Sequence, residues 1–447
     1  MTLAVIQPSP FCNINCDYCY LPDRAKTDRM GEETLRKVVE GLFATDLVRE
    51  EITFVWHAGE PLAVPREWYG KAFEIISRHA PAGVRITHSF QTNATLINEE
   101  WCDFIQKTGV CMGVSIDGPA RIHDAHRKTR SGSGTHERAM RGISLLKSQG
   151  IDFHVIAVVT GDSLDHPDEI FDFFVENGIT RFGFNVEEQE GIHEKSSLEG
   201  AGADRIEAFF QRIFERQKAL QGAVRVREFD FALQRILGKR AATKEDFVFE
   251  NEQVRPFGIL NIDWQGNFST FSPEMLGLAT EKYGIFTFGS FLNGGLEASL
   301  SNPAFLKVLE DTRAGVERCR RECGFFALCG GGAPANKYFE NGTFESTETA
   351  YCRNIIQLPI RIVLEDLEKS LPQTSPTNQP HTRAHRDYLR FLTPLPCNFK
   401  AERSSIYPDF PSSRPERPIN TIGAIFFGLR LCWFGLFGPG GRGGEEV

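Results

Sequence analysis

The chain lacks the features that mark nucleic-acid-binding, secreted and membrane proteins. Its net charge is −9, and no long basic run precedes its C-terminal part, so it has no cationic stretch suited to a phosphate backbone. Residues 1–8 contain no basic start followed by an apolar stretch, and therefore no secretory signal. We expect a cytoplasmic protein that has no nucleic-acid partner.

The cysteines are not spread as a disulfide framework would require. There are 11 of them, an odd number, and most fall in two groups, one close to the N-terminus and one beyond residue 318. This distribution favours metal ligands in a reducing compartment. With 447 residues and an apolar fraction of 41%, the chain can bury a large core, and we expect one large domain and a smaller one.

Strand-like and helix-like segments alternate through the first half of the chain. This alternation predicts an α/β fold with a parallel sheet, and about six βα units would form a partial (β/α)6 TIM-type barrel. The functional site of such a barrel lies at the C-terminal ends of its strands. After an opening strand near residue 3, the expected strands are 52–57, 84–90, 110–116, 153–159 and 181–186, and the expected helices are 35–43, 68–79, 99–107, 137–148 and 167–176.

Three cysteines, Cys12, Cys16 and Cys19, form a C-x3-C-x2-C run followed by Tyr20. Three thiolates on one loop can hold three irons of a 4Fe–4S cluster and leave the fourth iron open. The open iron can bind S-adenosylmethionine (SAM) through its amino and carboxylate groups, and reductive cleavage of SAM yields a 5'-deoxyadenosyl radical. The run resembles the signature of the radical SAM superfamily. A zinc knuckle is the alternative at this stage.

Residues 58–61 (Ala-Gly-Glu-Pro) follow the second expected strand and resemble the Gly-Gly-Glu-Pro segment of that superfamily, with Ala58 in place of the first glycine. The resemblance implies that Gly59 and Glu60 bind the amino group of SAM. An ordinary turn is the alternative for this segment.

Further polar residues stand at the next strand ends. By the same resemblance, Ser115 and Arg127 are the groups that hold the carboxylate of SAM, and a guanidinium fork suits a carboxylate well. Asn93 and Asp117 are additional cofactor-binding candidates that could instead form turns.

Candidate catalytic residues end the sixth expected strand. Asn185, Glu187 and Glu188 face the substrate side if the barrel interpretation holds. Carboxylates there suit acid–base chemistry, and a solvated charged loop is the alternative.

The second cysteine group contains Cys319, Cys323, Cys329 and Cys352, with three glycines directly after Cys329. Four thiolates can hold a closed 4Fe–4S cluster or a structural zinc ion. The order of these cysteines resembles the SPASM extension of peptide-modifying radical enzymes, which usually holds two auxiliary clusters. Phe271 and Ala333 stand at positions where that pattern has cysteines. The resemblance therefore implies one second, auxiliary 4Fe–4S cluster and an apolar filling where the other would be.

The segments Phe-Ser-Pro-Glu (271–274) and Cys-Gly-Gly-Gly-Ala-Pro-Ala-Asn-Lys (329–337) resemble the GrrM-type peptide maturases. The resemblance covers about residues 1–365. It implies a glycine-rich, aromatic-containing precursor peptide as substrate, a cyclophane crosslink between an aromatic ring and a β-carbon as product, and a low-potential electron donor such as flavodoxin or ferredoxin. Because few residues precede Cys12, we expect leader recognition by the barrel, by the extension or by a separate protein.

Two other functions stay open on the sequence alone. One is a formylglycine-forming sulfatase maturase, which normally keeps both auxiliary clusters. The other is a noncatalytic iron–sulfur or zinc-binding interaction module, which would bind metal without cleaving SAM.

We divide the chain at residues 230 and 370, into barrel (1–230), SPASM-like extension (231–370) and tail (371–447). Residues 371–418 are rich in Pro, Ser, Thr and Arg, which predicts a disordered linker. Residues 419–437 are mostly apolar and glycine-rich residues follow them. Arg430 near the centre of this stretch argues against a membrane span, so we expect a nonessential tail.

Overall fold

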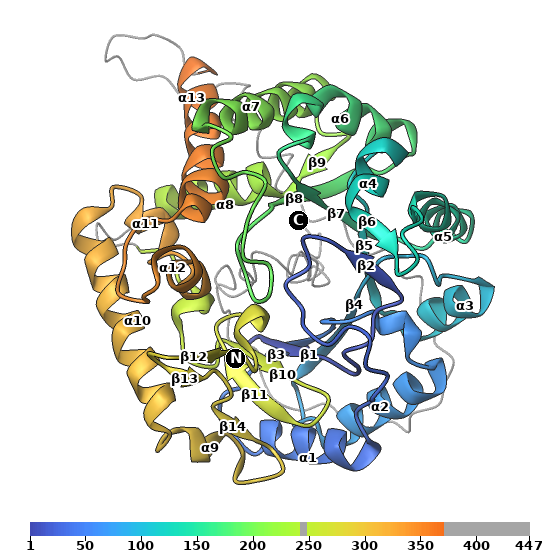
Figure 1. The fold of residues 1–447 in the computed structure, drawn as a ribbon, viewed down its shortest axis with the longest axis vertical. Coiled ribbons are helices and arrows are strands. Elements are labelled where there is room, and N and C mark those ends of the chain that lie inside the picture. Colours follow the sequence, from blue (N-terminus) through green and yellow to red (C-terminus); the bar gives the residue numbers. More distant parts are fainter. Residues whose placement is uncertain (242–247, 371–447) are drawn as a thin grey trace, which may run out of the picture.

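The computed structural model describes residues 1–241 and 248–370, and its centre is one ten-stranded sheet (Figure 1). Six strands pair in parallel in the order β1-β3-β4-β5-β7-β8. The expected partial barrel is confirmed. The bounds of these strands are Leu3–Ile6 (β1), Glu51–Trp56 (β3), Arg85–Thr92 (β4), Cys111–Ser115 (β5), Phe153–Val159 (β7) and Arg181–Val186 (β8).

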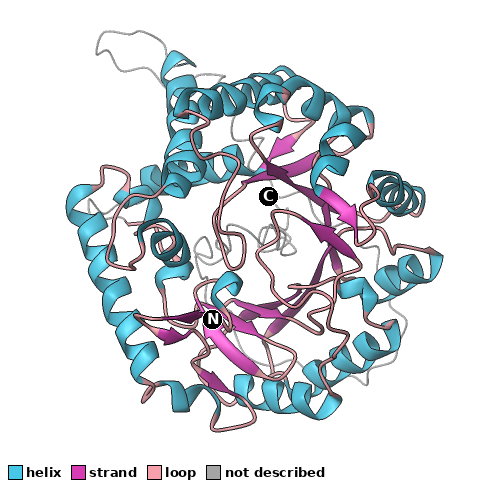
Figure 2. Cartoon of the chain, in the orientation of Figure 1, coloured by secondary structure: helices cyan, strands magenta, loops and turns pink. Residues whose placement is uncertain are grey.

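Helices line the outer side of the curved sheet, and the strands form its inner arc (Figure 2). Helix α1 shows why these segments are helical: its apolar residues recur at helical spacing, and Leu35, Val38, Val39 and Leu42 are all buried. The helices of this part are Glu32–Phe43 (α1), Arg66–His79 (α2), Glu99–Thr108 (α3), Ala120–His126 (α4), His136–Ser148 (α5), Pro167–Glu176 (α6), Ala203–Ala219 (α7) and Arg227–Ala241 (α8), with short 3-10 turns at Pro61–Ala63 (η1) and Ser163–Asp165 (η2).

The sheet continues past the six strands at both edges, which the sequence analysis did not predict. Strand β9 (Arg225–Val226) extends the β8 edge, and β10 (Ile259–Ile262) pairs in parallel with β1 at the other edge. Strands β11 (Asn267–Thr270) and β14 (Gly289–Ser290) add two antiparallel pairings beyond β10. The C-terminal extension therefore shares one hydrogen-bonded sheet with the barrel, and the domain division at residue 230 stays a prediction.

The rest of the extension is mainly helical and lies along one flank of the sheet (Figure 1). Helix α10 begins with Pro303, and the side chain of Asn302 accepts hydrogen bonds from the amides of Ala304 and Phe305, a strong N-terminal signal. The elements are Glu252–Val254 (η3), Pro273–Met275 (η4), Gly295–Ser299 (α9), Pro303–Glu322 (α10), Phe326–Cys329 (α11), Pro334–Asn341 (α12), a π-helical turn at Cys352–Gln357 (η5) and Leu358–Ser370 (α13).

Two small antiparallel pairs lie outside the main sheet. Strand β2 (Ile14–Cys16) pairs with β6 (Arg127–Thr129), so that Cys16 stands opposite Arg127. Strand β12 (Ala279–Thr280) pairs with β13 (Gly284–Ile285). The β2–β6 pair holds the N-terminal cysteine loop against the chain that follows β5.

The strands separate an apolar outer core from a more mixed interior. Alternate residues of a strand point to opposite faces, and in β1 Ala4 and Ile6 join the main core while Leu3 and Val5 pack with Val55 in a small separate cluster. Among the described residues, no helix combines the length and apolarity needed to cross a bilayer. The expectations for the tail concern residues 371–447, which lie outside the described residues.

Candidate functional site

The loop after β1 carries Cys12, Cys16 and Cys19 as free thiols. Its backbone is fixed by two arginines, because Arg24 Nη1 donates to the carbonyl of Cys16 at 2.9 Å and Arg130 Nη2 donates to that of Cys12 at 2.9 Å. Burial, with the nearby charge of Glu60, raises the pKa of Cys12 to about 12. A metal that binds these sulfurs must displace their protons, and the three-thiol donor set fits three irons of a cubane.

The Gly-Glu-Pro turn packs directly on the cysteine loop. The Glu60 amide donates to the carbonyl of Phe11 at 2.7 Å, and a Cβ on Gly59 would lie 2.4 Å from the carbonyl oxygen of Ser9. Gly59 has φ 146°, and Ala58 has φ 64°, a left-handed value that costs a non-glycine residue energy. The backbone here thus explains why a glycine is usual at the position of Ala58.

The Glu60 carboxylate is buried and already hydrogen bonded. It accepts from the Leu62 amide at 3.0 Å, the Thr92 hydroxyl at 2.6 Å and the Asn93 amide at 2.9 Å. Burial raises its pKa to about 7 in spite of these bonds. Glu60 therefore ties its turn to the end of β4, and its predicted contact with SAM stays a prediction.

Asn93 connects the same strand end to the cysteine loop. Its Nδ2 donates to Asn13 Oδ1 at 2.9 Å and lies 3.8 Å from Cys12 Sγ. Its Oδ1 accepts from the Thr95 amide at 3.0 Å, which is the turn-forming bond weighed as the alternative. The residue does both: it shapes a turn and contacts a predicted cluster ligand.

Arg127 is engaged by Asp117. Arg127 Nε donates to Asp117 Oδ2 at 2.9 Å and Nη2 donates to Oδ1 at 3.0 Å, and both side chains are buried. The Tyr18 hydroxyl donates to Asp117 Oδ2 at 2.5 Å, and the Val158 amide donates to Oδ1 at 2.9 Å. Burial alone would raise the pKa of Asp117, but the charge and hydrogen bonds of Arg127 hold it below its usual value.

Two predicted cofactor-binding residues thus bind each other, and a third lies apart. Ser115 Oγ accepts from Gln91 Nε2 at 2.9 Å, within the barrel. The roles predicted for Ser115, Asp117 and Arg127 toward SAM stay predictions.

The three candidate catalytic residues are separated by the fold. Asn185 Oδ1 accepts from Arg227 at 2.8 Å. Glu187 accepts from His193 Nε2 at 2.9 Å and from the Ser197 amide at 2.9 Å, so it organises its own loop. Glu188 instead accepts from Asn336 Nδ2 of α12, and so connects the barrel to the extension.

Glu188 lies among further carboxylates. Burial first, then the adjacent Glu340 and Glu274, raises the pKa of Glu188 well above its usual value. Glu274 is 4% exposed, and burial raises its pKa to about 7. Sequence reasoning gave Glu274 no role although it lies in a segment singled out for its resemblance, because 86 residues separate it from Glu188 along the chain.

The second cysteine group converges in space. Cys319, Cys323, Cys329 and Cys352 line one cavity, from the end of α10 to the start of η5. The glycines make this approach possible, since Gly332 has φ 78° and a Cβ there would lie 3.3 Å from Cys352 Sγ. Gly332 also donates its amide to Cys329 Sγ at 3.2 Å. The four-thiol set fits a closed cluster.

Single-ion geometry is absent from both groups. In residues 1–241 and 248–370, no three His, Cys, Asp or Glu side chains are arranged to hold one metal ion, so the four cysteines share a cavity without closing on a single-ion site. Phe271 and Ala333 are 0% and 2% exposed and belong to the main apolar core, and the ligand loss that the resemblance implies at these two positions stays a prediction.

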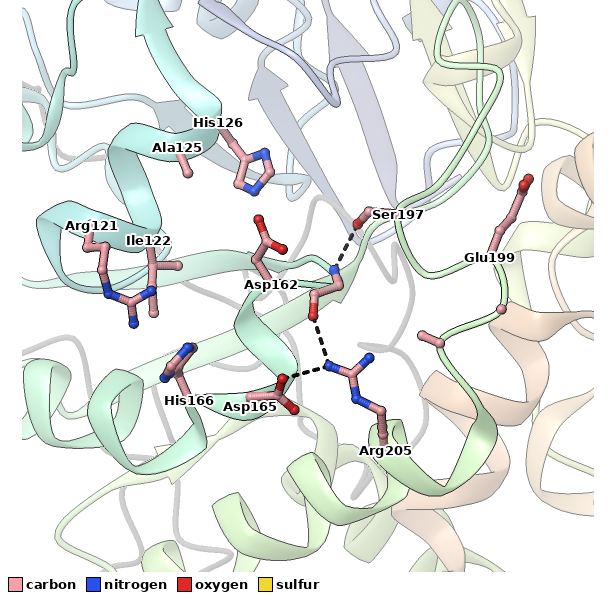
Figure 3. Close-up of a pocket in the computed structure, with 13 residues that line it drawn as sticks. Arg121, Ile122, Ala125, His126, Asp162, Asp165, His166, Ser197, Glu199 and Arg205 are labelled. Atoms are coloured by element: carbon pink, nitrogen blue, oxygen red, sulfur yellow. Dashed lines mark hydrogen bonds and ion pairs between the residues drawn. The ribbon is translucent and has the colours of Figure 1, made fainter.

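A separate pocket of about 560 Å³ opens between α4, η2 and the segment before α7 (Figure 3). Arg205 and Asp165 form an ion pair of 2.9 Å on its wall. His126 links the pocket to the cysteine loop, because its Nδ1 lies 3.0 Å from Asp17 Oδ1. None of the predicted cofactor-binding residues lines this pocket.

Comparison with known proteins agrees with this geometry. The Radical SAM superfamily model matches residues 6–174, and an uncharacterized protein of Synechocystis sp. is 42% identical over 374 residues, which are 83% of this chain and 92% of that protein. The chain belongs to the radical SAM superfamily. A radical SAM protein of this kind uses a 4Fe–4S cluster and SAM, and the C-terminal cysteines fit an auxiliary cluster.

Other similar proteins match less of the chain or only its fold. The serine-type anaerobic sulfatase-maturating enzyme of Klebsiella aerogenes is 36% identical over 184 residues, 41% of this chain and 45% of that enzyme. The structure of native anSMEcpe with bound AdoMet has a TM-score of 0.66 at 22% identity and covers 83% of this chain and 99% of that one. Streptococcus suis SuiB bound to precursor peptide SuiA has a TM-score of 0.54 at 15% identity, with 78% and 75% covered.

Gly59→Ala tests how tightly the turn of this radical SAM protein packs on the cysteine loop. We expect it to lower the free energy of unfolding by roughly 2–5 kcal/mol, because the new Cβ meets fixed backbone and the φ value suits only glycine. Gly83→Ala is the control: it also has a positive φ, of 90°, but nothing lies within 4 Å of the position that its new methyl group would take. Urea unfolding of both variants measures the two losses in the free energy of unfolding. Equal losses would show that the cysteine loop moves to accommodate the new methyl group.

Arg127→Lys tests the buried ion pair. The lysine keeps the charge and loses the two parallel bonds to Asp117, so we expect a loss of roughly 1–3 kcal/mol. Arg121→Lys is the control, because its ion pair with Glu169 is exposed and contributes about 1 kcal/mol or less. Thermal unfolding and SAM titration are measured together. Unchanged stability with weakened SAM binding would assign Arg127 to the cofactor instead of to Asp117.

The same pair makes stability depend on pH. The pKa of Asp117 is lower in the folded protein than in the unfolded chain, so its contribution is present above about pH 4 and is lost as the pH falls through the folded pKa. Asp117→Asn removes this acid-sensitive contribution. As the pH is lowered through the acid range, we expect the thermal unfolding midpoint of the variant to fall less than that of the unmodified protein.

Proposed function

We propose that this radical SAM enzyme modifies a ribosomally made precursor peptide by forming a carbon–carbon bond between an aromatic ring and the β-carbon of a nearby residue. The observation that carries the proposal is the altered extension. Four cysteines line one cavity, while Phe271 and Ala333 are buried in apolar core where the SPASM pattern has further cysteines. The sulfatase maturases normally keep those ligands, and GrrM-type enzymes resemble this chain in the two segments that contain Phe271 and Ala333.

Related proteins support a peptide substrate. SuiB was solved with its precursor peptide SuiA, and anSMEcpe was solved with bound AdoMet and the Cp18Cys peptide. Both share the fold of this chain. A glycine-rich precursor containing aromatic residues is the substrate that we propose.

The residues of the proposed site have different roles. Cys12, Cys16 and Cys19 hold the SAM-binding cluster, and Gly59 and Asn93 shape the backbone beside it. When bound, the cluster and SAM supply a 5'-deoxyadenosyl radical that abstracts hydrogen from the substrate. The reducing electron comes from a low-potential donor such as flavodoxin or ferredoxin.

Glu188 is the proton acceptor that we favour among the three candidates. Ring crosslinking ends with loss of a proton from the aromatic carbon, and a carboxylate with a raised pKa suits that transfer near neutral pH. Asn185 and Glu187 are held by Arg227, His193 and Ser197. Glu188 has Glu274 and Glu340 as neighbours, and a second carboxylate can share the proton.

Formylglycine formation is the second candidate function. The 36% identity to the Klebsiella aerogenes enzyme favours it. Both reactions remove two hydrogens from the peptide when the sulfatase residue is a serine, so a mass change alone does not separate them.

Coexpression with the small open reading frame beside the gene tests the proposal. We expect a peptide that has lost two hydrogens per crosslink, whose tandem mass spectrum lacks fragments inside the ring and which does not react with a hydrazide. An aldehyde that the hydrazide traps would establish formylglycine formation. In the control, Cys12, Cys16 and Cys19 are all replaced by Ala; that variant should form no 5'-deoxyadenosine and leave the peptide unchanged.

Glu188→Gln tests the proton acceptor. Glutamine keeps the acceptor oxygen for Asn336 and removes the base, so we expect the crosslinking rate to fall by roughly 10²-fold or more, while 5'-deoxyadenosine still forms. Glu194→Gln, on the same loop and exposed, is the control. Equal rates in the two variants would exclude Glu188 as the base.

A further inference from the structure

Lys337 is a buried cation at the second cysteine group. It lies in α12 and is 2% exposed, and its Nζ donates to Cys319 Sγ at 3.2 Å. Removing an ammonium from water costs several kcal/mol unless opposite charge or hydrogen bonds compensate. The contact with Cys319 shows where that compensation comes from.

No carboxylate balances this charge. Across the part of the chain that the structure describes, Lys337 forms no ion pair with an Asp or Glu side chain, and its side chain bonds only to Cys319. Glu348 lines the cysteine cavity and is already paired with Arg353 at 3.0 Å. The sulfur of Cys319, which becomes a thiolate when it binds a cluster, is therefore the group that Lys337 faces.

A second buried cation acts on the same group. Arg235 of α8 is 6% exposed, and its charge interacts with Cys329. Lys337 and Arg235 thus place positive charge near two of the four cysteines. If the cysteines only packed in the core or only stabilised the fold, they would need no cation beside them.

Positive charge beside a 4Fe–4S cluster favours its reduced state. Reduction by one electron makes a cluster with four thiolate ligands more negative, and hydrogen bonds to its sulfurs act in the same direction. A fixed ammonium in contact with one ligand sulfur stabilises the more negative state most.

We propose that Lys337 raises the reduction potential of the auxiliary cluster and so prepares that cluster to accept an electron. The inference rests on the proposed ligands Cys319, Cys323, Cys329 and Cys352, and it deepens the proposed function, because crosslinking releases one electron with each ring proton. Lys337 acts through the cluster and is a tuning residue, not a catalytic one.

The test measures the auxiliary cluster alone. In the full chain with Cys12, Cys16 and Cys19 replaced by Ala, anaerobic reconstitution should leave about four irons per chain. A redox titration followed by electron paramagnetic resonance then gives the midpoint potential of that cluster. Lys337→Met should change the ratio of oxidised to reduced cluster at a fixed potential at least tenfold toward oxidised, a shift of about 59 mV for one electron.

Two further variants complete the design. Lys337→Arg keeps the charge and should keep a potential close to that of the parent. Lys369→Met removes an exposed lysine of α13 and should change nothing. A Lys337→Met variant with four irons and an unchanged potential overturns the proposal. If neither Lys337→Met nor Lys337→Gln holds the cluster, Lys337 assembles the site and does not tune it, which also overturns the proposal, as does stoichiometric zinc in the parent.

The outcome is independent of the peptide reaction. The titration uses neither SAM nor peptide. An unchanged potential would therefore reject the tuning role of Lys337 and would not reject the proposed crosslinking reaction. Conversely, a shifted potential in a protein that makes formylglycine would uphold the tuning role and reject the crosslinking function.

Discussion

The buried pair of Arg127 and Asp117 joins the parts of the molecule that have to meet at the site. Asp117 follows β5 and accepts a hydrogen bond from the Val158 amide of β7, while Arg127 begins β6 and stands opposite Cys16 of β2. Tyr18, between Cys16 and Cys19, donates to the same carboxylate. A buried charge left without its partner costs about 3–5 kcal/mol, so loss of either residue would weaken the attachment of the cysteine loop to the sheet.

The continuous sheet gives the second constraint. Because β10 pairs with β1, the strand that leads into the first cysteine loop is hydrogen bonded to the first strand of the extension. The chain leaves the opposite edge after β9 and returns through α8, which also carries Arg227 and Arg235. Side chains from both halves can therefore meet over the strand ends, as Glu188 and Asn336 do.

The repeating features of the fold were predictable, and the local pairings were not. Helix α6 and strands β7 and β8 have the bounds expected from apolar spacing, because a periodic buried face decides both. Strands β10 and β11 have four residues each, too few to show a period, and their place at the sheet edge is set by tertiary pairing. For Arg127 the sequence did not indicate the pairing with Asp117, which depends on the fold, and its predicted role toward SAM stays a prediction. Glu188 and Glu274 are a second example: the fold brings their carboxylates close together although 86 residues separate them along the chain.

Phe271 combines an uncommon backbone conformation with complete burial. Its φ is 75°, a left-handed value that costs a residue with a side chain about 1–2 kcal/mol, yet it is fully buried in the core. Burial of a phenylalanine contributes about 1.5–3 kcal/mol and offsets that cost. The backbone has an uncommon conformation at this position, and the aromatic ring supplies the packing that offsets it. Beside Cys319 and Cys329, by contrast, the structure places the buried cations Lys337 and Arg235. The two regions therefore differ in electrostatics, because one is apolar and the other carries positive charge next to sulfur.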